Sequence, residues 1–238
     1  MKKKLGIIGG MGSHAAAWLF NKVVALSYGE KDQEYIEILL HNNTAIPDRT
    51  AAILYQGASP VPELIRSVEV LNSHNIDVAV MACLTAHYYK PMLSAHFNGQ
   101  WIDPIESTIG RIQEWYACTK GLKVGVIATT GTLRSGLFQK AMAPTGMEVV
   151  SLEGEAQEQY FMRPVYMPGG AKSGGIRQEA IDLFARQIPL LKEMGADLII
   201  GACSEVPLLL DAASIDLPYI SVFDLFAQKI VDVCYCRA

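Results

Sequence analysis

The sequence predicts an α/β protein with two pseudo-symmetric lobes, each a mostly parallel sheet flanked by helices. Two observations predict this fold class. Short apolar segments alternate with longer amphipathic ones along the 238 residues, and continuous apolar strands are typical of parallel sheets that are covered on both faces. A set of landmarks also occurs twice in the same order, which indicates an internal duplication.

The duplication is visible as pairs of matching segments at nearly constant spacing. The pairs are Gly6 with Gly125, 119 positions apart, Cys83 with Cys203, 120 positions apart, and segment 101–107 with segment 219–224 at a similar distance. A repeat this long predicts two lobes rather than a solenoid. We expect the first lobe to contain residues 1–103 plus 224–238 and the second lobe to contain 104–223.

The expected elements follow the alternation of apolar and amphipathic segments. Strands are expected at 4–8, 35–41, 77–82, 101–102, 123–128, 147–150, 197–202 and 219–222. Helices are expected at 14–27, 62–74, 85–95, 104–117, 134–143, 176–194, 204–210 and 223–235. Ligands of such sheets bind at the carboxyl ends of the strands, so the active site is expected in the cleft between the lobes.

Composition argues against several classes of function. Half of the residues are hydrophobic, 18% are charged, and the formal net charge is −4, so neither a basic field nor a basic stripe favours nucleic acid as a partner. No apolar run reaches the roughly 18–20 residues of a membrane span, and no signal-peptide pattern precedes Gly6. Five cysteines, an odd number, fit free thiols in a reducing compartment. We therefore expect a cytoplasmic protein.

Cys83 and Cys203 each end an apolar, strand-like run and open a polar turn. A single cysteine is often a small buried hydrophobe, so each one alone indicates a structural role. Their paired placement at strand ends, beside helix N-termini that lower a thiol pKa, favours two reactive thiols instead. Two thiols that face each other across a cleft can form a proton-transfer pair. Thr85 and Ser204 would supply hydroxyls for a bound carboxylate or amine.

His87 lies one helical turn after Cys83. It could polarise the thiol or only pack and bond the backbone, and we favour the supporting role. A zinc site formed by Cys83, His87 and Cys203 would have suitable ligand types but lacks the usual clustered spacing. The remaining cysteines lie away from strand ends and are interpreted as non-catalytic: Cys118, Cys234 and Cys236.

The glycine-rich turn 9–13, which includes Met11 and Gly12, lies between the first expected strand and helix. Its backbone N–H groups could hold a carboxylate or another small anion, or the glycines could serve only a tight turn. A loose G-x-G-x-x-A pattern also starts at Gly10, but the next strand lacks the acidic residue that would bind a ribose. NAD is therefore the weakest of the three interpretations.

Two cationic side chains are candidates for binding a carboxylate. Arg49 follows a Pro-Asp turn in which Asp48 could cap a helix that begins near Thr50, and its guanidinium can form two parallel hydrogen bonds with a carboxylate. The alternative is a solvated surface arginine. Lys172 lies in the glycine-rich segment 165–174, which could close over a cleft or could be an exposed flexible loop.

Together these residues resemble the cofactor-independent aspartate/glutamate racemase family, and the aspartate racemases in particular. The matching motifs extend over nearly the whole chain and lie at 9–12, 42–43, 46–50, 83–88, 128–132, 166–174 and 203–208. The resemblance implies two pseudo-symmetric α/β lobes, a homodimer, and activity with neither pyridoxal phosphate nor a metal. It also implies interconversion of L- and D-aspartate, or of a closely related acidic amino acid, by proton transfer at Cα.

The resemblance further implies roles for individual residues. Cys83 and Cys203 would be the two catalytic bases. Arg49 and Lys172 would recognise the side-chain carboxylate of the substrate. The other residues implied to contact the substrate are Met11, Gly12, Thr85, Thr130, Ser204 and Glu205.

The sequence departs from the family pattern beside the first cysteine. The usual asparagine, whose amide helps to bind the amino-acid head group, is replaced by Leu84, which can neither donate nor accept a hydrogen bond. Milder changes are Ser204 in place of threonine and Ser13 in place of a common proline. An isomerase or decarboxylase of a related dicarboxylate is therefore one alternative, and a degenerate amino-acid-binding protein is another.

Overall fold

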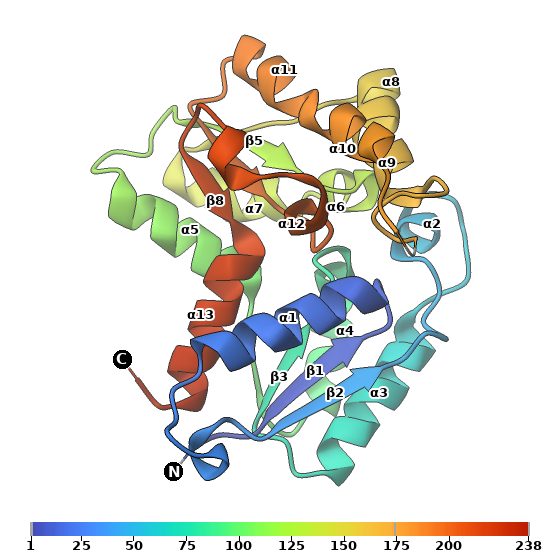
Figure 1. The fold of residues 1–238 in the computed structure, drawn as a ribbon, viewed down its shortest axis with the longest axis vertical. Coiled ribbons are helices and arrows are strands. Elements are labelled where there is room, and N and C mark those ends of the chain that lie inside the picture. The colour runs from blue at the N-terminus through green and yellow to red at the C-terminus, as the bar shows by residue number, and fades with distance from the viewer. Residues whose placement is uncertain (1, 174, 238) are drawn as a thin grey trace. The chain divides into compact units, whose positions relative to one another are not determined.

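The computed structural model describes residues 2–173 and 175–237. Contacts divide the chain into two compact units, which we call the first lobe (Met1–Pro104 with Asp224–Ala238) and the second lobe (Ile105–Phe223). The chain thus leaves the first lobe, builds the second, and returns to the first in a final helix (Figure 1).

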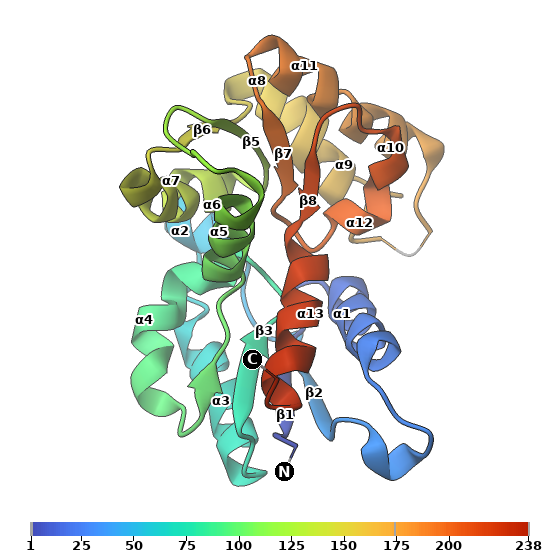
Figure 2. The same ribbon diagram turned by 90° about the vertical axis from the view of Figure 1, so that its left-hand side faces the viewer.

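The first lobe is built on a four-stranded parallel sheet in the order β2-β1-β3-β4. Its strands are β1 (Leu5–Gly9), β2 (Ile38–Asn42), β3 (Val78–Met81) and β4 (Gln100–Trp101). Helices α1 (Ser13–Leu26) and α13 (Val222–Cys234) lie on one face, and α3 (Val61–Ser73) and α4 (Lys90–Leu93) lie on the other (Figure 2). A short α2 (Arg49–Leu54) follows β2.

The second lobe repeats this plan in the order β6-β5-β7-β8, again with all neighbours parallel. Its strands are β5 (Lys123–Ile127), β6 (Glu148–Val150), β7 (Leu198–Gly201) and β8 (Tyr219–Ser221). Its α-helices are α5 (Pro104–Trp115), α6 (Thr130–Arg134), α7 (Leu137–Met142), α8 (Gly154–Gln157), α9 (Arg163–Tyr166), α10 (Gln178–Ala185), α11 (Gln187–Glu193) and α12 (Val206–Leu209). The predicted fold class of two duplicated α/β lobes is confirmed.

One pair of hydrogen bonds shows how closely the two sheets match. In the first lobe the backbone N–H of Lys4 donates to Asp77 Oδ2 at 2.8 Å, and in the second lobe the N–H of Lys123 donates to Asp197 Oδ2, also at 2.8 Å. Each aspartate precedes the third strand of its sheet and bonds the residue at the start of the first strand. The same contact therefore aligns the first and third strands of both sheets.

All eight predicted strands are present, but several predicted helices differ. The helix expected at 85–95 is a 3₁₀ turn at Thr85–Tyr89, then α4, then a 3₁₀ turn at Ser94–His96. Pro91 explains the first break, because it has no N–H to donate to the fourth residue before it. The helix expected at 176–194 is likewise interrupted at Arg186, because Pro189 has no N–H to donate to the carbonyl of Ala185, four residues before it.

Two other helical segments differ from the prediction. The helix expected at 134–143 is two helices, separated at Gly136, whose φ of +71° is a left-handed conformation that favours glycine. The helical segment 154–166, which includes a π-helix at Glu158–Met162, was not predicted at all. In the part of the chain that the structure describes, no helix is long and apolar enough to cross a membrane.

Candidate functional site

Cys83 and Cys203 lie at equivalent points of the two sheets, each two residues after the third strand ends. The residue before each cysteine donates its N–H to the first strand: Ala82 to the Ile8 carbonyl at 3.0 Å, and Ala202 to the Ile127 carbonyl at 2.8 Å. Both side chains are buried, with 6% of each residue exposed. Within each lobe, the carboxyl end of the sheet therefore holds one thiol in a fixed backbone position.

The thiol of Cys203 has a carboxylate partner. Its Sγ donates to Glu205 Oε2 at 2.9 Å, and the Ser204 hydroxyl donates to the same oxygen at 2.9 Å. The other oxygen, Oε1, lies 3.5 Å from Lys172 Nζ. Glu205 is only 3% exposed, and a buried charge is costly unless it is paired and hydrogen-bonded. Oε2 thus accepts two hydrogen bonds, and Lys172 supplies an opposite charge beside Oε1.

The surroundings of Cys83 are different, because its neighbours hold its backbone. His87 Nδ1 lies 3.1 Å from the Cys83 carbonyl oxygen, and the Ala86 N–H donates to the same oxygen at 3.2 Å. A carbonyl only accepts, so His87 must carry its proton on Nδ1. Of the two roles considered for His87, the structure supports packing and backbone bonding rather than a direct bond to the thiol.

His87 is also held in its neutral form by its environment. Burial lowers the pKa of His87, and the nearby charges of Asp103 and Lys90 act in opposite directions. The ring meets Phe226 edge-on, with centroids 6.4 Å apart. Its Nε2 has no hydrogen-bond partner among the described residues. A neutral, Nδ1-protonated imidazole thus braces the residue that carries the thiol.

The elements that follow the two cysteines are shorter than the sequence predicts. Cys83 precedes a 3₁₀ turn that begins at Thr85, which is buried, and Cys203 precedes the four-residue α12. A helical element therefore follows each cysteine as expected, but as a 3₁₀ turn and one short helix instead of helices over 85–95 and 204–210. Leu84, directly after Cys83, is 2% exposed and adds an apolar surface at this position.

The turn after β1 is held by Arg49. Its Nη2 donates to the Met11 carbonyl at 2.8 Å and its Nη1 to the Pro47 carbonyl at 3.0 Å. Arg49 is 6% exposed, so the alternative of a solvated surface arginine is wrong. The predicted cap is confirmed, since Asp48 Oδ1 accepts from the Ala51 N–H at 2.7 Å at the start of α2.

Glycines allow this turn to form. Gly10 has φ of +83°, and a Cβ there would lie 2.1 Å from the Asn43 carbonyl oxygen. Gly12 has φ of +139° and caps α1 without a side-chain hydrogen bond. The close approach of Gly10 to Asn43 brings the loop after β2, and with it Arg49, against the turn after β1.

The corresponding turn after β5 contains threonines. Thr129 caps α6 by accepting the Thr132 N–H at 3.2 Å, and the two hydroxyls lie 3.0 Å apart. Thr130 is half-buried, and its N–H points to Met162 Sδ at 3.5 Å. Gln157 Nε2 donates to the Ala128 carbonyl at 2.9 Å. The sequence predicted Thr130 as a site residue but did not predict Gln157 or Met162.

A sequence signal for Gln157 does exist. Gln157, Phe161, Pro164 and Val165 are all buried and stand at the spacing of one helix face. A glutamine in an otherwise apolar stripe indicates a buried hydrogen-bonding role. The proline in the stripe conceals it, because proline normally ends a helix.

The segment that carries Lys172 is fixed by its backbone. The N–H of Lys172 donates to the Val165 carbonyl at 3.1 Å, and Ala171 donates to the Pro164 carbonyl at 3.1 Å. A Cβ on Gly170 would lie 2.3 Å from the Pro164 carbonyl oxygen. Residues 165–172 therefore form a packed turn rather than a loose loop, and Gly174 of the predicted segment lies outside the described residues.

The candidate residues gather into one group per lobe. The first lobe holds Cys83 and Thr85 at the end of β3, and Met11, Gly12 and Arg49 at the end of β1. The second lobe brings Lys172, Cys203, Ser204 and Glu205 into direct contact, with Thr130 at the end of β5. Among the described residues, no three His, Cys, Asp or Glu side chains gather closely enough to hold a metal ion.

Known proteins of the same fold include racemases. The aspartate racemase of Picrophilus torridus superposes with a TM-score of 0.81 at 23% identity, covering 98% of this chain and 94% of that one. Two parallel four-stranded sheets flanked by helices are thus a two-lobed racemase fold. A broad specificity amino-acid racemase of Bacillus subtilis is 22% identical over 232 residues, which are 95% of this chain and 96% of that protein.

The sequence match goes beyond the fold. A glutamate racemase of Carboxydothermus hydrogenoformans is 36% identical over 106 residues, which are 43% of this chain and 36% of that protein's length. The sequence profile of the family described as Asp/Glu/hydantoin racemase matches residues 8–230. The chain belongs to this family of isomerases.

Proposed function

We propose that the chain is a cofactor-independent amino-acid racemase that interconverts L- and D-aspartate, with Cys83 and Cys203 as its two bases. One observation carries the proposal: each lobe has a cysteine two residues beyond its third strand, fixed by the same backbone hydrogen bond to the first strand. Family membership adds the class of reaction. The residues at the carboxyl ends of the sheets are proposed to form the active site, because such folds bind ligands there.

In the proposed reaction one cysteine acts as a thiolate and removes the proton from Cα. The electron pair of the broken C–H bond moves into the α-carboxylate, and the opposite thiol delivers a proton to the other face of Cα. The first cysteine is then a thiol and the second a thiolate, so the reverse reaction exchanges their roles. Protons and electrons balance without any oxidant or cofactor.

The Glu205 carboxylate gives the Cys203 thiol a route to ionisation. A free thiol has a pKa of about 8.5, so only a small fraction is thiolate at neutral pH. Because Cys203 already donates to Glu205 Oε2 at 2.9 Å, its proton can pass to the carboxylate without reaching solvent. Lys172, 3.5 Å from Oε1, balances the charge that this pair carries.

Two cations, the buried Arg49 and the half-buried Lys172, support an acidic substrate. Arg49 and Lys172 are proposed to bind its side-chain carboxylate, for which a guanidinium offers paired donors. The α-carboxylate must gain charge in the transition state, and single donors to such an oxyanion contribute about 3–4 kcal/mol in other enzymes. Five residues are proposed to donate hydrogen bonds to the α-carboxylate or to line its binding site: Met11, Gly12, Thr85, Thr130 and Ser204.

The test is isotope exchange combined with removal of each thiol. In D₂O, the wild-type protein should introduce deuterium at Cα as it racemises aspartate, read by mass spectrometry and chiral chromatography. Cys83→Ala and Cys203→Ala should each abolish interconversion, whereas Cys118→Ala, at an exposed cysteine, should leave it unchanged. Full racemisation by either single active-site variant would eliminate the two-base proposal.

Leu84 favours a second candidate. An apolar, buried side chain directly after Cys83 suits a substrate that lacks an amino group, which would make the protein an isomerase or decarboxylase of a dicarboxylate. A screen of both enantiomers of aspartate and glutamate, neutral amino acids, maleate and arylmalonates separates the two. Binding of an amino acid by calorimetry without exchange at Cα would instead indicate a binding protein.

The family resemblance also leads us to propose that the protein acts as a homodimer in the cytoplasm. Light scattering coupled to gel filtration tests the oligomeric state. A mass of one 26.0 kDa chain at assay concentrations would contradict the dimer.

A further inference from the structure

The segment after β6 forms an unusual helix with a clear chemical cause. Residues Glu158–Met162 form a π-helix, in which hydrogen bonds join residues five apart. Pro164 cannot donate to the carbonyl of Tyr160, and the buried Gln187 supplies the missing donor at 3.0 Å. One carbonyl of the irregular segment is therefore satisfied by a side chain from α11.

The π-helix brings two residues to the turn after β5. Gln157 and Met162 are five residues apart, so one π-helical turn places them side by side. Met162 Sδ accepts the Thr130 N–H at 3.5 Å, and Gln157 Nε2 lies 3.5 Å from Thr130 Oγ1 while it donates to the Ala128 carbonyl at 2.9 Å. Both the backbone and the hydroxyl of Thr130 thus face partners from this one segment.

Gln157 has a counterpart in the first lobe. Arg49 is the seventh residue after β2 ends at Asn42, and Gln157 is the seventh after β6 ends at Val150. Each is buried, and each donates to a carbonyl of the turn that follows the first strand of its own sheet. By the duplicated spacing, Met11 in the first turn corresponds to Thr130 in the second.

We propose that Gln157 is a positioning residue for substrate binding: it fixes the turn after β5 so that Thr130 is presented to the substrate. This inference rests on the proposed function, in which Thr130 contacts the amino acid. Gln157 does not touch the substrate in this proposal. A carboxamide suits the task because one Nε2–H can hold the Ala128 carbonyl while the other faces the Thr130 hydroxyl.

Gln187 offers a matched control in the same lobe. It is also a buried glutamine, 1% exposed, and its Nε2 also donates to two oxygens, the carbonyls of Tyr160 and Phe184 at 3.0 and 3.1 Å. Those carbonyls belong to the helices and not to the turn. Loss of each glutamine should cost similar stability, so a difference in substrate binding isolates the role of the turn.

The kinetic test compares Gln157→Met with Gln187→Met, since methionine keeps the length and removes the donors. For Gln157→Met we expect the KM for aspartate to rise about tenfold with kcat within about threefold of wild type, the pattern of lost ground-state binding. Gln187→Met should keep the wild-type KM. Equal KM values in the two variants would overturn the proposal. If Gln157→Met does not fold, Gln157→Asn, whose amide is one methylene too short, takes its place.

Hydrogen exchange tests the same claim without a substrate. The amides of residues 130–133 should exchange at least tenfold faster in Gln157→Met than in wild type, while β7 amides keep their rates. Unchanged exchange in the turn would overturn the proposal even if aspartate is racemised. Conversely, if the variant shows the expected faster exchange but the wild-type protein turns over no acidic amino acid, the proposed function alone would be refuted.

Discussion

The two lobes have the same strand order and the same aspartate hydrogen bond between the first and third strands, but their cysteines have different hydrogen-bond partners. In the first lobe, His87 and Ala86 bond the carbonyl of Cys83 and leave its thiol to other partners. In the second lobe, Glu205 bonds the thiol of Cys203 itself. The two halves therefore share the position of the thiol but not its partners. The thiol of Cys203 is hydrogen-bonded to a carboxylate, whereas the hydrogen bonds at Cys83 are made by its backbone carbonyl.

The largest expected effect comes from removing the Glu205 carboxylate. Glu205→Gln keeps the shape of the side chain, but an amide cannot take a proton from Cys203. We expect kcat to fall by about 10²–10⁴, the usual contribution of a positioned acid or base. Steady-state kinetics with each enantiomer of aspartate measure the loss.

Ser204→Ala is the matched control for this variant. It removes one of the hydrogen bonds to Glu205 Oε2 and leaves the thiol–carboxylate contact in place. Its kcat should fall less than that of Glu205→Gln, because the thiol–carboxylate contact remains. If both variants lost kcat equally, the carboxylate would not be acting as the proton acceptor.

The next prediction compares how much a substitution in the turn after β1 and one in the turn after β5 lower the free energy of unfolding. Gly10→Ala would place a Cβ 2.1 Å from the Asn43 carbonyl oxygen at φ of +83°, so we expect a loss of about 2–3 kcal/mol in the free energy of unfolding. Its duplicated counterpart Thr129 has φ of −61°. Thr129→Ala should cost only about 1 kcal/mol, the value of a helix cap. Urea denaturation of both variants makes the comparison, and equal losses would show that the turns share one backbone requirement.

The smallest effect concerns His87, whose lowered pKa makes stability depend on pH. The unfolded chain binds a proton at its ordinary pKa of about 6.5, but the buried imidazole resists protonation. The contribution of neutral His87 to the free energy of unfolding should therefore be fully present above that pH and should decrease as the pH drops below it. His87→Asn should reduce the fall between pH 7 and 5 by about 1 kcal/mol.

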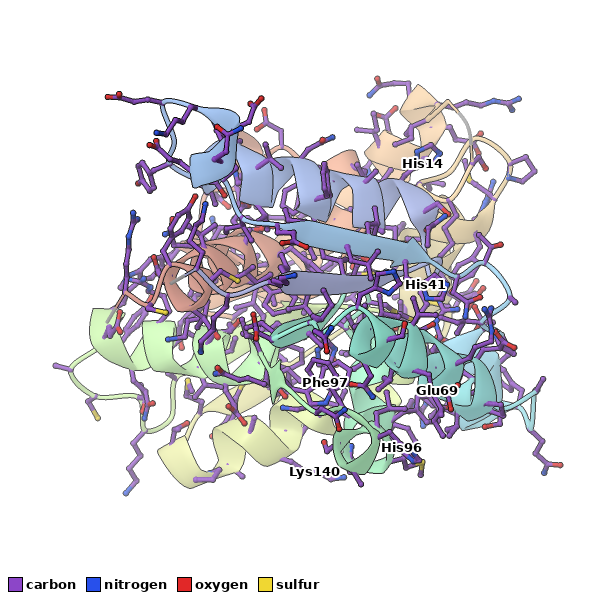
Figure 3. All side chains as sticks on the ribbon, turned by 90° about the horizontal axis from the view of Figure 1, so that it is seen from below. His14, His41, Glu69, His96, Phe97 and Lys140 are labelled. Atoms are coloured by element: carbon purple, nitrogen blue, oxygen red, sulfur yellow. The ribbon has the colours of Figure 1, made fainter. Side chains whose placement is uncertain are left out.

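His96→Gln is the control for the histidine prediction, since His96 is exposed on the surface of the first lobe (Figure 3). It should keep the wild-type pH dependence of unfolding, measured by urea titration at each pH. An identical slope for His87→Asn and wild type would mean that His87 takes up its proton as readily in the folded protein as in the unfolded chain.

The sequence predicted the parts of the fold that depend on local composition. All eight strands lie where short apolar segments predicted them, and the duplication of Gly6 and Cys83 in the second half revealed the two lobes. Helix boundaries were less predictable, because Pro91 and Pro189 act on carbonyls several residues upstream. The Cys203–Glu205 hydrogen bond depends on side-chain rotamers that only packing selects. The role of Gln157 was not predicted, because the π-helix next to it departs from regular α-helical spacing.

The return of α13 to the first lobe also sets an order of folding. Phe226 and Ile230 of this helix are fully buried, and Lys3 donates its N–H to the Cys234 carbonyl at 2.8 Å. During synthesis the second lobe is complete once residue 223 has emerged, whereas the first lobe, though made earlier, waits for residues 224–234. Until then one face of its sheet is covered by α1 alone, so the half of the protein that is synthesised first depends longest on protection from aggregation.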